Sequence, residues 1–351
     1  MHVRHFAPAA HLRSGGAALP SFAGLHSSII LGTLIERARL RLMQEQPRRR
    51  RVPLSRLALA AWLMSLVAPW ALFVSGGMRA VVGWLLLASV NALVGVVSVL
   101  AVLIHAAWKR RLSWGMRTIL VAALVAIWPG LWNFNIGLIT FPVSLARTRP
   151  TATVRLPSNE PLRTVWGGDS SKVNRHATTP DQRWAYDFVI GQALVGSENL
   201  TDYGCYGTPV VAPVSARVAR AIDGEPDQVP GKLSGNTRRP LGNAVVFKLA
   251  SGTFLIIAHL QRGSVRVKAG DTVSEGQLIG LCGNSGNTSE PHIHIHHQRQ
   301  NPATHPVNFA EGLPLFFRDN SGPTMPTGGV EERDGKPVSI GATVTHRGSG
   351  R

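Results

Sequence analysis

The chain has 351 residues, 44% of them hydrophobic, and a formal net charge of +18 at pH 7. The charge is uneven, because residues 1–146 hold 15 Lys and Arg against 2 Asp and Glu, whereas residues 147–351 hold 22 against 17. The excess lies beside long apolar runs rather than on a polar or aromatic-lined face. The composition therefore argues against nucleic acid as a partner.

Residues 1–56 have the composition of a basic cytoplasmic tail, with the run RRRR at 48–51. No convincing signal-peptide cleavage site follows the short apolar patch IILGTLI. The stretch MQEQPRRRR, which begins at Met43, would be a sensible tail by itself. The natural start is therefore either Met1 or Met43, and in the second case residues 1–42 are a mis-assigned extension.

Three uncharged stretches follow, at residues 57–78, 80–108 and 118–146. Each is long enough to cross a bilayer, which takes about 20 apolar residues. We expect a membrane region of three transmembrane helices over residues 57–146. Pro129 and Pro142 would kink or shorten the third helix.

The basic residues beside these stretches predict their orientation. Nine Lys and Arg flank the ends that would face the cytoplasm, and three flank the opposite ends, namely Arg79, Arg147 and Arg149. The positive-inside rule then places the N-terminus in the cytoplasm and everything after about residue 146 on the outer, periplasmic or extracellular, side. We expect a multi-pass protein of the cytoplasmic membrane whose partners include the lipid bilayer.

From residue 150 the sequence changes to short apolar runs separated by Gly, Pro, Asn and Asp, as in NAVVFKLASGTFLIIAHL. This texture predicts a compact all-β domain of antiparallel sheets. We expect a linker at 147–164, the β domain at 165–315, and an extended C-terminal segment at 316–351 with a turn at Asp334 and Gly335.

The most informative stretch is PHIHIHH at 291–297. On a strand, alternate side chains share a face, so His292, His294 and His296 would lie together while Ile293 and Ile295 point to the opposite side. Such a row suits a metal centre, because neutral imidazole binds zinc and titrates near neutrality. The alternative is a polar strand face without function.

The only two cysteines, Cys205 and Cys282, both fall in the domain expected on the oxidising side of the membrane. A disulfide between them is permitted there, but the distance between them cannot be read from the sequence.

Several segments together resemble a known family. GTPVVAPVSARV, GNAVVFKL, IIAHL and VKAGDTVSEGQLIGLCGNSGNTSEPHIHIH are similar, in this order, to lysostaphin-like zinc endopeptidases, which cleave peptide bonds in bacterial peptidoglycan. The resemblance covers about residues 165–300 and implies the duplicated-hybrid-motif type of all-β fold. It implies one Zn²⁺ per chain on His294 and an upstream His and Asp, here His176 and Asp187. It assigns catalytic roles to His292 and His259.

The sequence departs from this family in two places. The family places the upstream Asp four residues after the His, whereas His176 and Asp187 are eleven apart, so an insertion must loop out. Asp181 is the alternative ligand, but it follows Pro180 in a turn-like run, whereas Asp187 lies in the strand-like WAYDFVI. His296 stands where the family often has Glu, and it either supports the site from behind the ligands or is exposed.

The resemblance implies a membrane-anchored zinc metalloendopeptidase that acts on peptidoglycan peptides through a zinc-activated water. His292 would accept the proton of the water and His259 would stabilise the oxyanion, or the two roles would be exchanged. The alternative is a non-catalytic scaffold of the same fold that binds cell wall or regulates other wall hydrolases. A biotinyl or lipoyl carrier is disfavoured because no Lys stands at a hairpin tip, and a transporter because the spans hold no inward charges.

Overall fold

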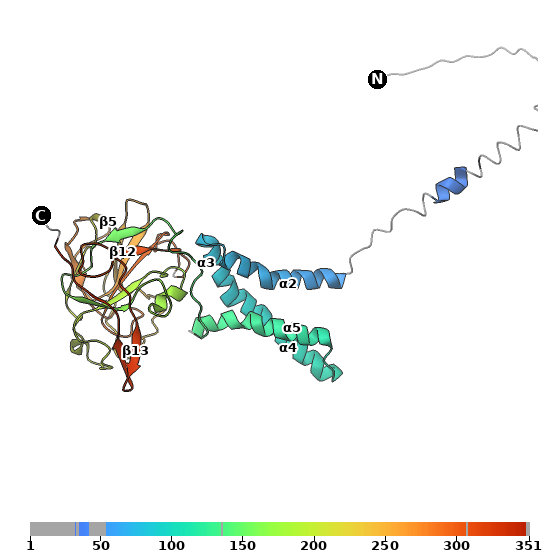
Figure 1. The fold of residues 1–351 in the computed structure, drawn as a ribbon, viewed down its shortest axis with the longest axis horizontal. Coiled ribbons are helices and arrows are strands. Elements are labelled where there is room, and N and C mark those ends of the chain that lie inside the picture. The colour runs from blue at the N-terminus through green and yellow to red at the C-terminus, as the bar shows by residue number, and fades with distance from the viewer. Residues whose placement is uncertain (1–31, 33–34, 42–53, 135, 307, 349–351) are drawn as a thin grey trace, which may run out of the picture. The chain divides into compact units, whose positions relative to one another are not determined.

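The computed structural model describes residues 32, 35–41, 54–134, 136–306 and 308–348 (Figure 1). Most of the expected basic tail at 1–56, including both candidate start residues, lies outside the described residues. The chain divides into two units, Met1–Leu59 and Ala60–Arg351. The second unit contains the apolar helices from residue 60 onward and all the strands described below.

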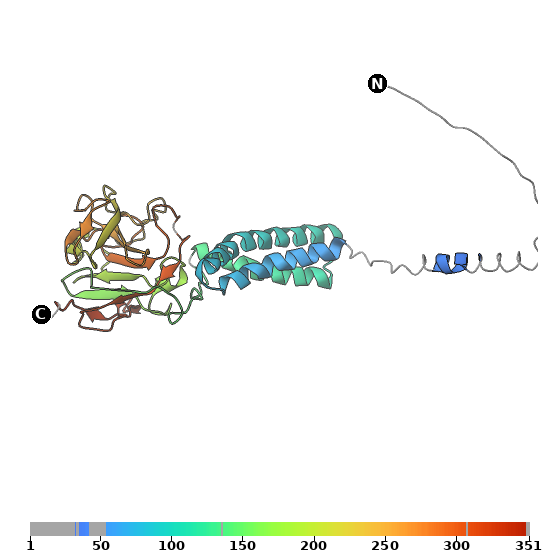
Figure 2. The same ribbon diagram turned by 90° about the horizontal axis from the view of Figure 1, so that it is seen from above.

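The apolar half forms helices that lie alongside one another (Figure 2). They are α2 (Leu54–Phe73), α3 (Gly77–Leu85), a π-helical turn (Leu86–Asn91), α4 (Ala92–Lys109), α5 (Trp114–Ile127) and a 3₁₀ turn (Trp128–Phe134). By length and composition, Gly77–Lys109 and Trp114–Phe134 are long and apolar enough to cross a membrane, whereas the apolar helix Leu59–Phe73 is shorter. The count of three spans therefore stays a prediction.

The third apolar stretch is helical over a shorter range than expected. We expected a span at 118–146, but the helix begins at Trp114 and ends at Phe134. Pro129 supplies no backbone N–H, and the helix tightens to 3₁₀ geometry around it. The chain then leaves the helical segment, and the Phe141 N–H donates to the Ala177 carbonyl of the β domain at 2.8 Å.

Small and polar residues hold the helices together. The Asn91 side chain donates to the Leu66 carbonyl at 3.0 Å and is buried, so it joins two helical segments. A Cβ on Gly95 would lie 2.6 Å from the Ala123 carbonyl, so only glycine permits this approach of α4 to α5. Glycine at such contacts is typical of membrane helix pairs.

The β domain is built on a nine-stranded antiparallel sheet in the order β15-β2-β3-β10-β7-β6-β5-β8, with β11 paired to β10. Its strands are β2 (Leu162–Trp166), β3 (Tyr186–Val189), β5 (Ala216–Ile222), β6 (Asn243–Lys248), β7 (Phe254–Leu260), β8 (Thr272–Val273), β10 (Ile293–Gln298), β11 (Gly312–Leu313) and β15 (Thr343–Val344). Two-stranded sheets pair β4 (Pro209–Val211) with β9 (Leu278–Leu281), β13 (Val330–Arg333) with β14 (Lys336–Ser339), and β1 (Ala152–Val154) with β12 (Leu315–Phe317). The β1–β12 pair is parallel, so the expectation of antiparallel sheets holds for the main sheet but not throughout.

The alternation of side chains separates the two faces of the central strands. On β10, Ile293 and Ile295 join the main hydrophobic core together with Leu255 and Ile257 of β7. The opposite face of β7 carries Ala258, which lies opposite His294 in register. The expected period of two is therefore present, and it places the histidines on one face of the sheet.

Both ends of the β domain extend further than expected. The segment 147–164, expected to be a linker, contains β1 and the beginning of β2. The segment 316–351, expected to be extended, contains a hairpin and then β15, which adds to the edge of the main sheet beside β2. The expected turn is there, since Asp334 and Gly335 have φ of 52° and 72° between β13 and β14. β15 and β1 form in these segments because they pair with the backbone N–H and C=O groups of β2 and β12, respectively.

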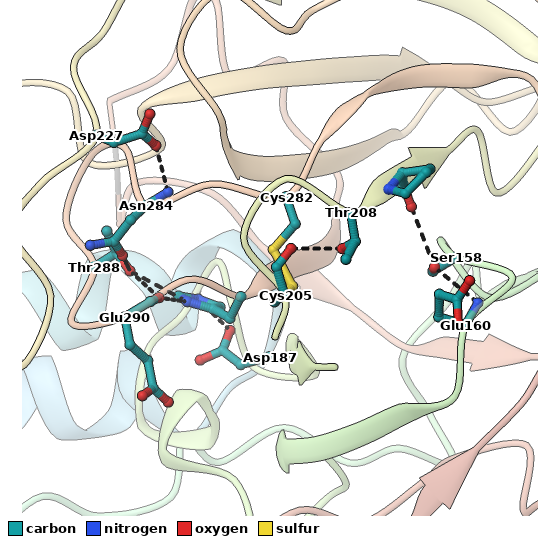
Figure 3. The surroundings of a disulfide bond; sticks show 12 residues. Ser158, Glu160, Asp187, Cys205, Thr208, Asp227, Cys282, Asn284, Thr288 and Glu290 are labelled. Atoms are coloured by element: carbon teal, nitrogen blue, oxygen red, sulfur yellow. Dashed lines mark hydrogen bonds and ion pairs between the residues drawn. A yellow bond between two sulfur atoms is a disulfide. The ribbon is translucent and has the colours of Figure 1, made fainter. Parts of the chain in front are cut away.

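Cys205 and Cys282 form a disulfide with their Cα atoms 5.8 Å apart (Figure 3). Thr208 ties the same region together, because its hydroxyl donates to the Cys205 carbonyl and its carbonyl accepts from the Cys282 N–H. Cys282 also bridges to Leu260 at the end of β7. The disulfide therefore anchors the beginning of the loop 283–291 that leads into β10.

The first prediction concerns this disulfide. The double variant Cys205→Ser, Cys282→Ser should lose about 2–5 kcal/mol of unfolding free energy, because a cross-link over 77 residues restricts the unfolded chain. Denaturant unfolding of the oxidised protein, the reduced protein and the variant measures this. Equal midpoints for the oxidised and reduced proteins would contradict it.

Candidate metal and catalytic site

The site begins at β10, whose neighbours bring partners to His294 from both sides. In register, His294 lies opposite Asp187 of β3 and opposite Ala258 of β7. The His294 Nδ1 lies 2.8 Å from Asp187 Oδ1, and both side chains are buried. Strand pairing thus brings together two residues that are 107 positions apart.

His176 reaches the same carboxylate although it is eleven residues from Asp187. It lies in a 3₁₀ turn at Arg175–Thr178, and its Nε2 lies 2.9 Å from Asp187 Oδ2. Asn174 closes the intervening loop, because its side-chain amide donates to the Gly168 and Ala185 carbonyls while its oxygen caps the turn. The insertion therefore folds back, and the unusual spacing does not separate the two residues.

Asp181, the alternative upstream residue, does not join this group. It is buried, and its Oδ2 accepts the N–H of Asn308 at 3.1 Å. Burial raises the pKa of Asp181, against the smaller effect of its backbone hydrogen bonds. Its position is structural, as expected for a turn residue.

His259 is turned into the site by an irregularity of β7. The register between β6 and β7 shifts between Asn243 and Val245, so that β7 has one extra residue there. His259 has φ of 62°, a left-handed conformation that a non-glycine residue rarely adopts. Its Nδ1–H donates to the Ser285 carbonyl at 2.8 Å, which leaves Nε2 toward the other histidines. A bulge of this kind commonly re-aims a side chain beside an active site.

His292 is fixed by the loop that precedes β10. Its Nδ1–H donates to the Glu290 carbonyl at 2.7 Å, and its Nε2 lies 3.5 Å from Asp187 Oδ1. Thr288 donates to the same Glu290 carbonyl and lies next to Asn284, whose backbone N–H donates to Asp227 (Figure 3). This polar network gives the loop one conformation, and with it the position of His292.

Of the two alternatives for His296, the structure has the buried one, in which it lies behind His294. Its Nδ1 is 2.9 Å from His294 Nε2, and its Nε2 is 3.0 Å from the side-chain oxygen of Gln298. The Gln298 amide nitrogen donates to the Gln300 carbonyl at 2.6 Å, which fixes the orientation of the amide. Sequence reasoning did not anticipate Gln298, Asn174 or Ser285 as supports, because a buried Gln, Asn or Ser carries no distinctive pattern.

The direction of this hydrogen-bond chain has a consequence for His294. Because the Gln298 oxygen can only accept, the Nε2 of His296 carries the proton and its Nδ1 accepts from His294 Nε2–H. A neutral His294 then presents a lone pair from Nδ1 to Asp187 Oδ1, so two acceptors face each other at 2.8 Å. Such a pair is unfavourable unless a cation lies between the two atoms, and either a proton or a metal ion would meet this need.

Burial and charge shift the titration of these groups. Although burial alone would raise the pKa of Asp187, the facing His176 and His292 hold it well below its usual value. Burial lowers the pKa of His259 well below its usual value and the pKa of His294 to about 4. Burial also opposes protonation of His292, but the nearby Asp187 carboxylate raises its pKa overall. The carboxylate therefore stays ionised in the metal-free protein.

Two groups of residues have the composition of a metal site, and they share His294. In each group, His176 with Asp187 and His294, or His259 with His292 and His294, the ligand atoms lie within 4.8 Å of one another. Only the first includes a carboxylate, and the ring nitrogens of His176 and His294 both lie against the oxygens of Asp187. Two His and one carboxylate are a common ligand set for catalytic zinc. The residues present therefore fit a zinc ion.

A cavity of about 760 Å³ lies in front of these groups. All the predicted site residues except His296 line it, together with a wall from the helical segment and the loops that precede β6 and β10. These lining residues include Trp84, Trp132, Leu138, Leu233, Leu241 and Asn287. The size suits a bound peptide segment, since ligand sites typically measure about 300–1,000 Å³.

The buried carboxylate, its converging imidazoles and the open cavity define a metallohydrolase-like site on a β scaffold. Residues 198–306 match the model of peptidase family M23. This segment is thus similar to an M23 peptidase domain. His259, His292 and His294 lie within the matched residues, whereas His176 and Asp187 precede them, so their membership in the site rests on the geometry.

Individual proteins resemble parts of the chain. A match to endolysin 2638A of Staphylococcus phage 2638A has 39% identity over 88 residues, which is 22% of this chain and 18% of the endolysin. Lysostaphin from Staphylococcus simulans has 20% identity over 45% of this chain and 50% of that one, with a TM-score of 0.27. The catalytic domain of the M23 protein EnpA from Enterococcus faecalis has 19% identity over 46% and 93%, with a TM-score of 0.27.

The second prediction uses His297, which follows His296 but faces the opposite side. Burial lowers its pKa to about 4, and its ring contacts Thr253 and the Pro314 carbonyl rather than the site. A histidine kept neutral by folding contributes stability that is complete above the unfolded pKa of about 6.5 and is lost as the pH falls toward about 4.

The metal-free protein should therefore lose stability between pH 6.5 and 4, and His297→Gln should reduce the slope by up to about 1.4 kcal/mol per pH unit. Denaturant unfolding at several pH values measures both slopes. An unchanged slope in the variant would show that His297 does not contribute.

Proposed function

We propose that the chain is a membrane-anchored zinc metalloendopeptidase that cleaves peptide bonds in bacterial peptidoglycan. The observation that carries the proposal is the contact between His294 Nδ1 and Asp187 Oδ1, which the Gln298–His296 chain leaves without a proton. His176 completes this group from the other side of the carboxylate. The match to peptidase family M23 supports the substrate class.

His176, Asp187 and His294 would hold one zinc ion. When bound, zinc lowers the pKa of a coordinated water and polarises a carbonyl group. His296 and Gln298 would orient His294 from behind, because a ligand imidazole needs a partner on its second nitrogen. In this chain that partner is an imidazole where related sites often have a carboxylate, so His294 receives less negative charge from behind.

His292 and His259 would move protons on the side of the cavity. Each donates its Nδ1–H to a backbone carbonyl, so each neutral ring presents a bare Nε2 to the site. We propose that His292 accepts the proton of the attacking water at Nε2. His259 would stabilise the oxyanion only after its own Nε2 gains a proton, which its burial resists. The exchange of the two roles is thus the alternative that the hydrogen bonding leaves open.

We further propose that the apolar helices anchor the enzyme in the cytoplasmic membrane and that the peptidase domain lies on the outer side. The nine basic residues at the expected cytoplasmic ends against three at the other ends support this orientation. The disulfide suits an oxidising compartment. Peptidoglycan lies in the same compartment.

The third prediction separates metal binding from proton transfer. His294→Ala, His176→Ala and Asp187→Ala should each strip the metal, because a three-ligand site has no spare donor. His292→Ala should keep about one zinc per chain and still lose roughly 10²- to 10⁴-fold in turnover. Metal analysis beside hydrolysis of a purified wall peptide measures both.

His296→Ala and His297→Ala provide matched controls on the same strand. His296→Ala should weaken zinc affinity by about 10- to 100-fold without abolishing binding, because it removes only the orienting partner. His297→Ala should change neither quantity, since its ring faces away. Zinc binding without any hydrolysis in the unsubstituted protein would favour a non-catalytic scaffold, and zinc loss in His292→Ala but not His294→Ala would reverse the two roles.

The fourth prediction concerns orientation. Protease added to intact spheroplasts should digest the domain after residue 150, because the loop charges place it outside. Immunoblots against the C-terminal region follow the cleavage, and a cytoplasmic protein serves as the control for intact cells. Protection of the domain until the cells are lysed would overturn the topology.

A further inference from the structure

A second cavity, of about 670 Å³, shares no lining residue with the histidine site. Its walls are the turn between α2 and α3 at residues 74–79, the segment 142–149, and residues Arg299 and Glu311 of the β domain. It therefore lies where the two outer ends of the apolar helices meet the β domain.

Four arginines line this cavity. Arg79, Arg147 and Arg149 are the three basic residues that flank the outer ends of the apolar stretches, and Arg299 follows β10. The first three come from two separate parts of the chain, α3 and the segment 142–149, and line one concavity.

These charges are not neutralised within the protein. Among the described residues, Glu311 is the only acidic residue of the lining, and Arg299 already occupies it at 2.6 Å. Arg79, Arg147 and Arg149 form no ion pair with any described residue and are exposed. Arg149 donates only to the Leu145 and Thr148 carbonyls. The cavity therefore keeps an excess of three positive charges in a concave surface, which focuses the potential.

We propose that this cavity binds the phosphate group of an anionic lipid headgroup. Guanidinium groups bind phosphate oxygens through paired, charge-assisted hydrogen bonds, so a cavity lined by several arginines suits this ligand. The volume is in the range of small-molecule sites, about 300–1,000 Å³. The arginines carry the argument, and the N-terminus of α3 at Gly77 adds to the same positive field.

The position of the cavity favours a lipid as the source of the phosphate. The candidate membrane span Gly77–Lys109 begins in the lining of the cavity, and the lining segment 142–149 follows the candidate span Trp114–Phe134. In the proposed membrane placement the rim would lie at the level of the headgroups. This choice of source rests on the proposed membrane placement, whereas the affinity for phosphate does not. Neither depends on peptidase activity.

The test uses the full chain in nanodiscs of phosphatidylcholine with or without phosphatidylglycerol. Native mass spectrometry counts the lipid that stays bound after release. We expect the unsubstituted protein to retain phosphatidylglycerol and the triple variant Arg79→Gln, Arg147→Gln, Arg149→Gln to retain at least about tenfold less, which corresponds to about 1.4 kcal/mol.

A matched control removes the same net charge from elsewhere. Exposed arginines that line neither cavity and form no ion pair with a described residue are replaced in the triple variant Arg217→Gln, Arg220→Gln, Arg266→Gln. This variant should retain the lipid as the unsubstituted protein does. Unchanged zinc content in both variants shows that the β domain is folded.

The outcomes separate the sources of phosphate. Inorganic phosphate is then added as a competitor to the unsubstituted protein and to the cavity variant. If it displaces the lipid only from the unsubstituted protein, the cavity prefers the free anion to the lipid, and phosphate binding by the arginines stands. Equal losses in the cavity and control variants would show that only net charge matters, and equal retention in all three proteins would show no site. Either result overturns the proposal. If the topology test fails, arginine-dependent phosphate binding can still be measured on the protein in detergent.

Discussion

The contact between Asp187 and His294 is the constraint on which the site depends. A carboxylate buried to this degree must be compensated, because an uncompensated buried charge costs several kcal/mol. The sheet provides compensation by pairing β3 with β10, and the 3₁₀ turn brings His176 to the second oxygen. Without a cation, the histidines themselves must supply the positive charge, although burial opposes their protonation. The β scaffold therefore holds a group that a bound cation would stabilise.

Two structural devices support this centre at its edges. On one side, the left-handed backbone of His259 and the bulge of β7 aim its ring inward, and the Ser285 carbonyl holds it there. Such a conformation costs of order 1–3 kcal/mol and persists only where the surroundings impose it. On the other side, Cys282 of the Cys205–Cys282 disulfide directly precedes the loop that contains Ser285 and leads to His292. The strained residue and its acceptor are thus held by the same cross-link.

The sequence was informative where a residue's chemistry appears in a periodic pattern. The alternation of His and Ile at 292–296 predicted the two faces of β10, because the strand period leaves no other arrangement. It was uninformative where the outcome depended on a non-local partner. Whether His296 is exposed depends on what packs over that face, and the strands at 152–154 and 343–344 exist only because β12 and β2 offer unpaired edges.

The two cavities lie at different places between the helical segment and the β domain. The first is walled partly by Trp84 and Trp132, so the end of the helical segment limits how a substrate approaches the histidines. The second is lined by Arg79 and by arginines of the segment 142–149. Phosphate bound there would bridge the α2–α3 turn, the segment 142–149 and Arg299. An anchor of this kind would position the peptidase domain as well as retain it.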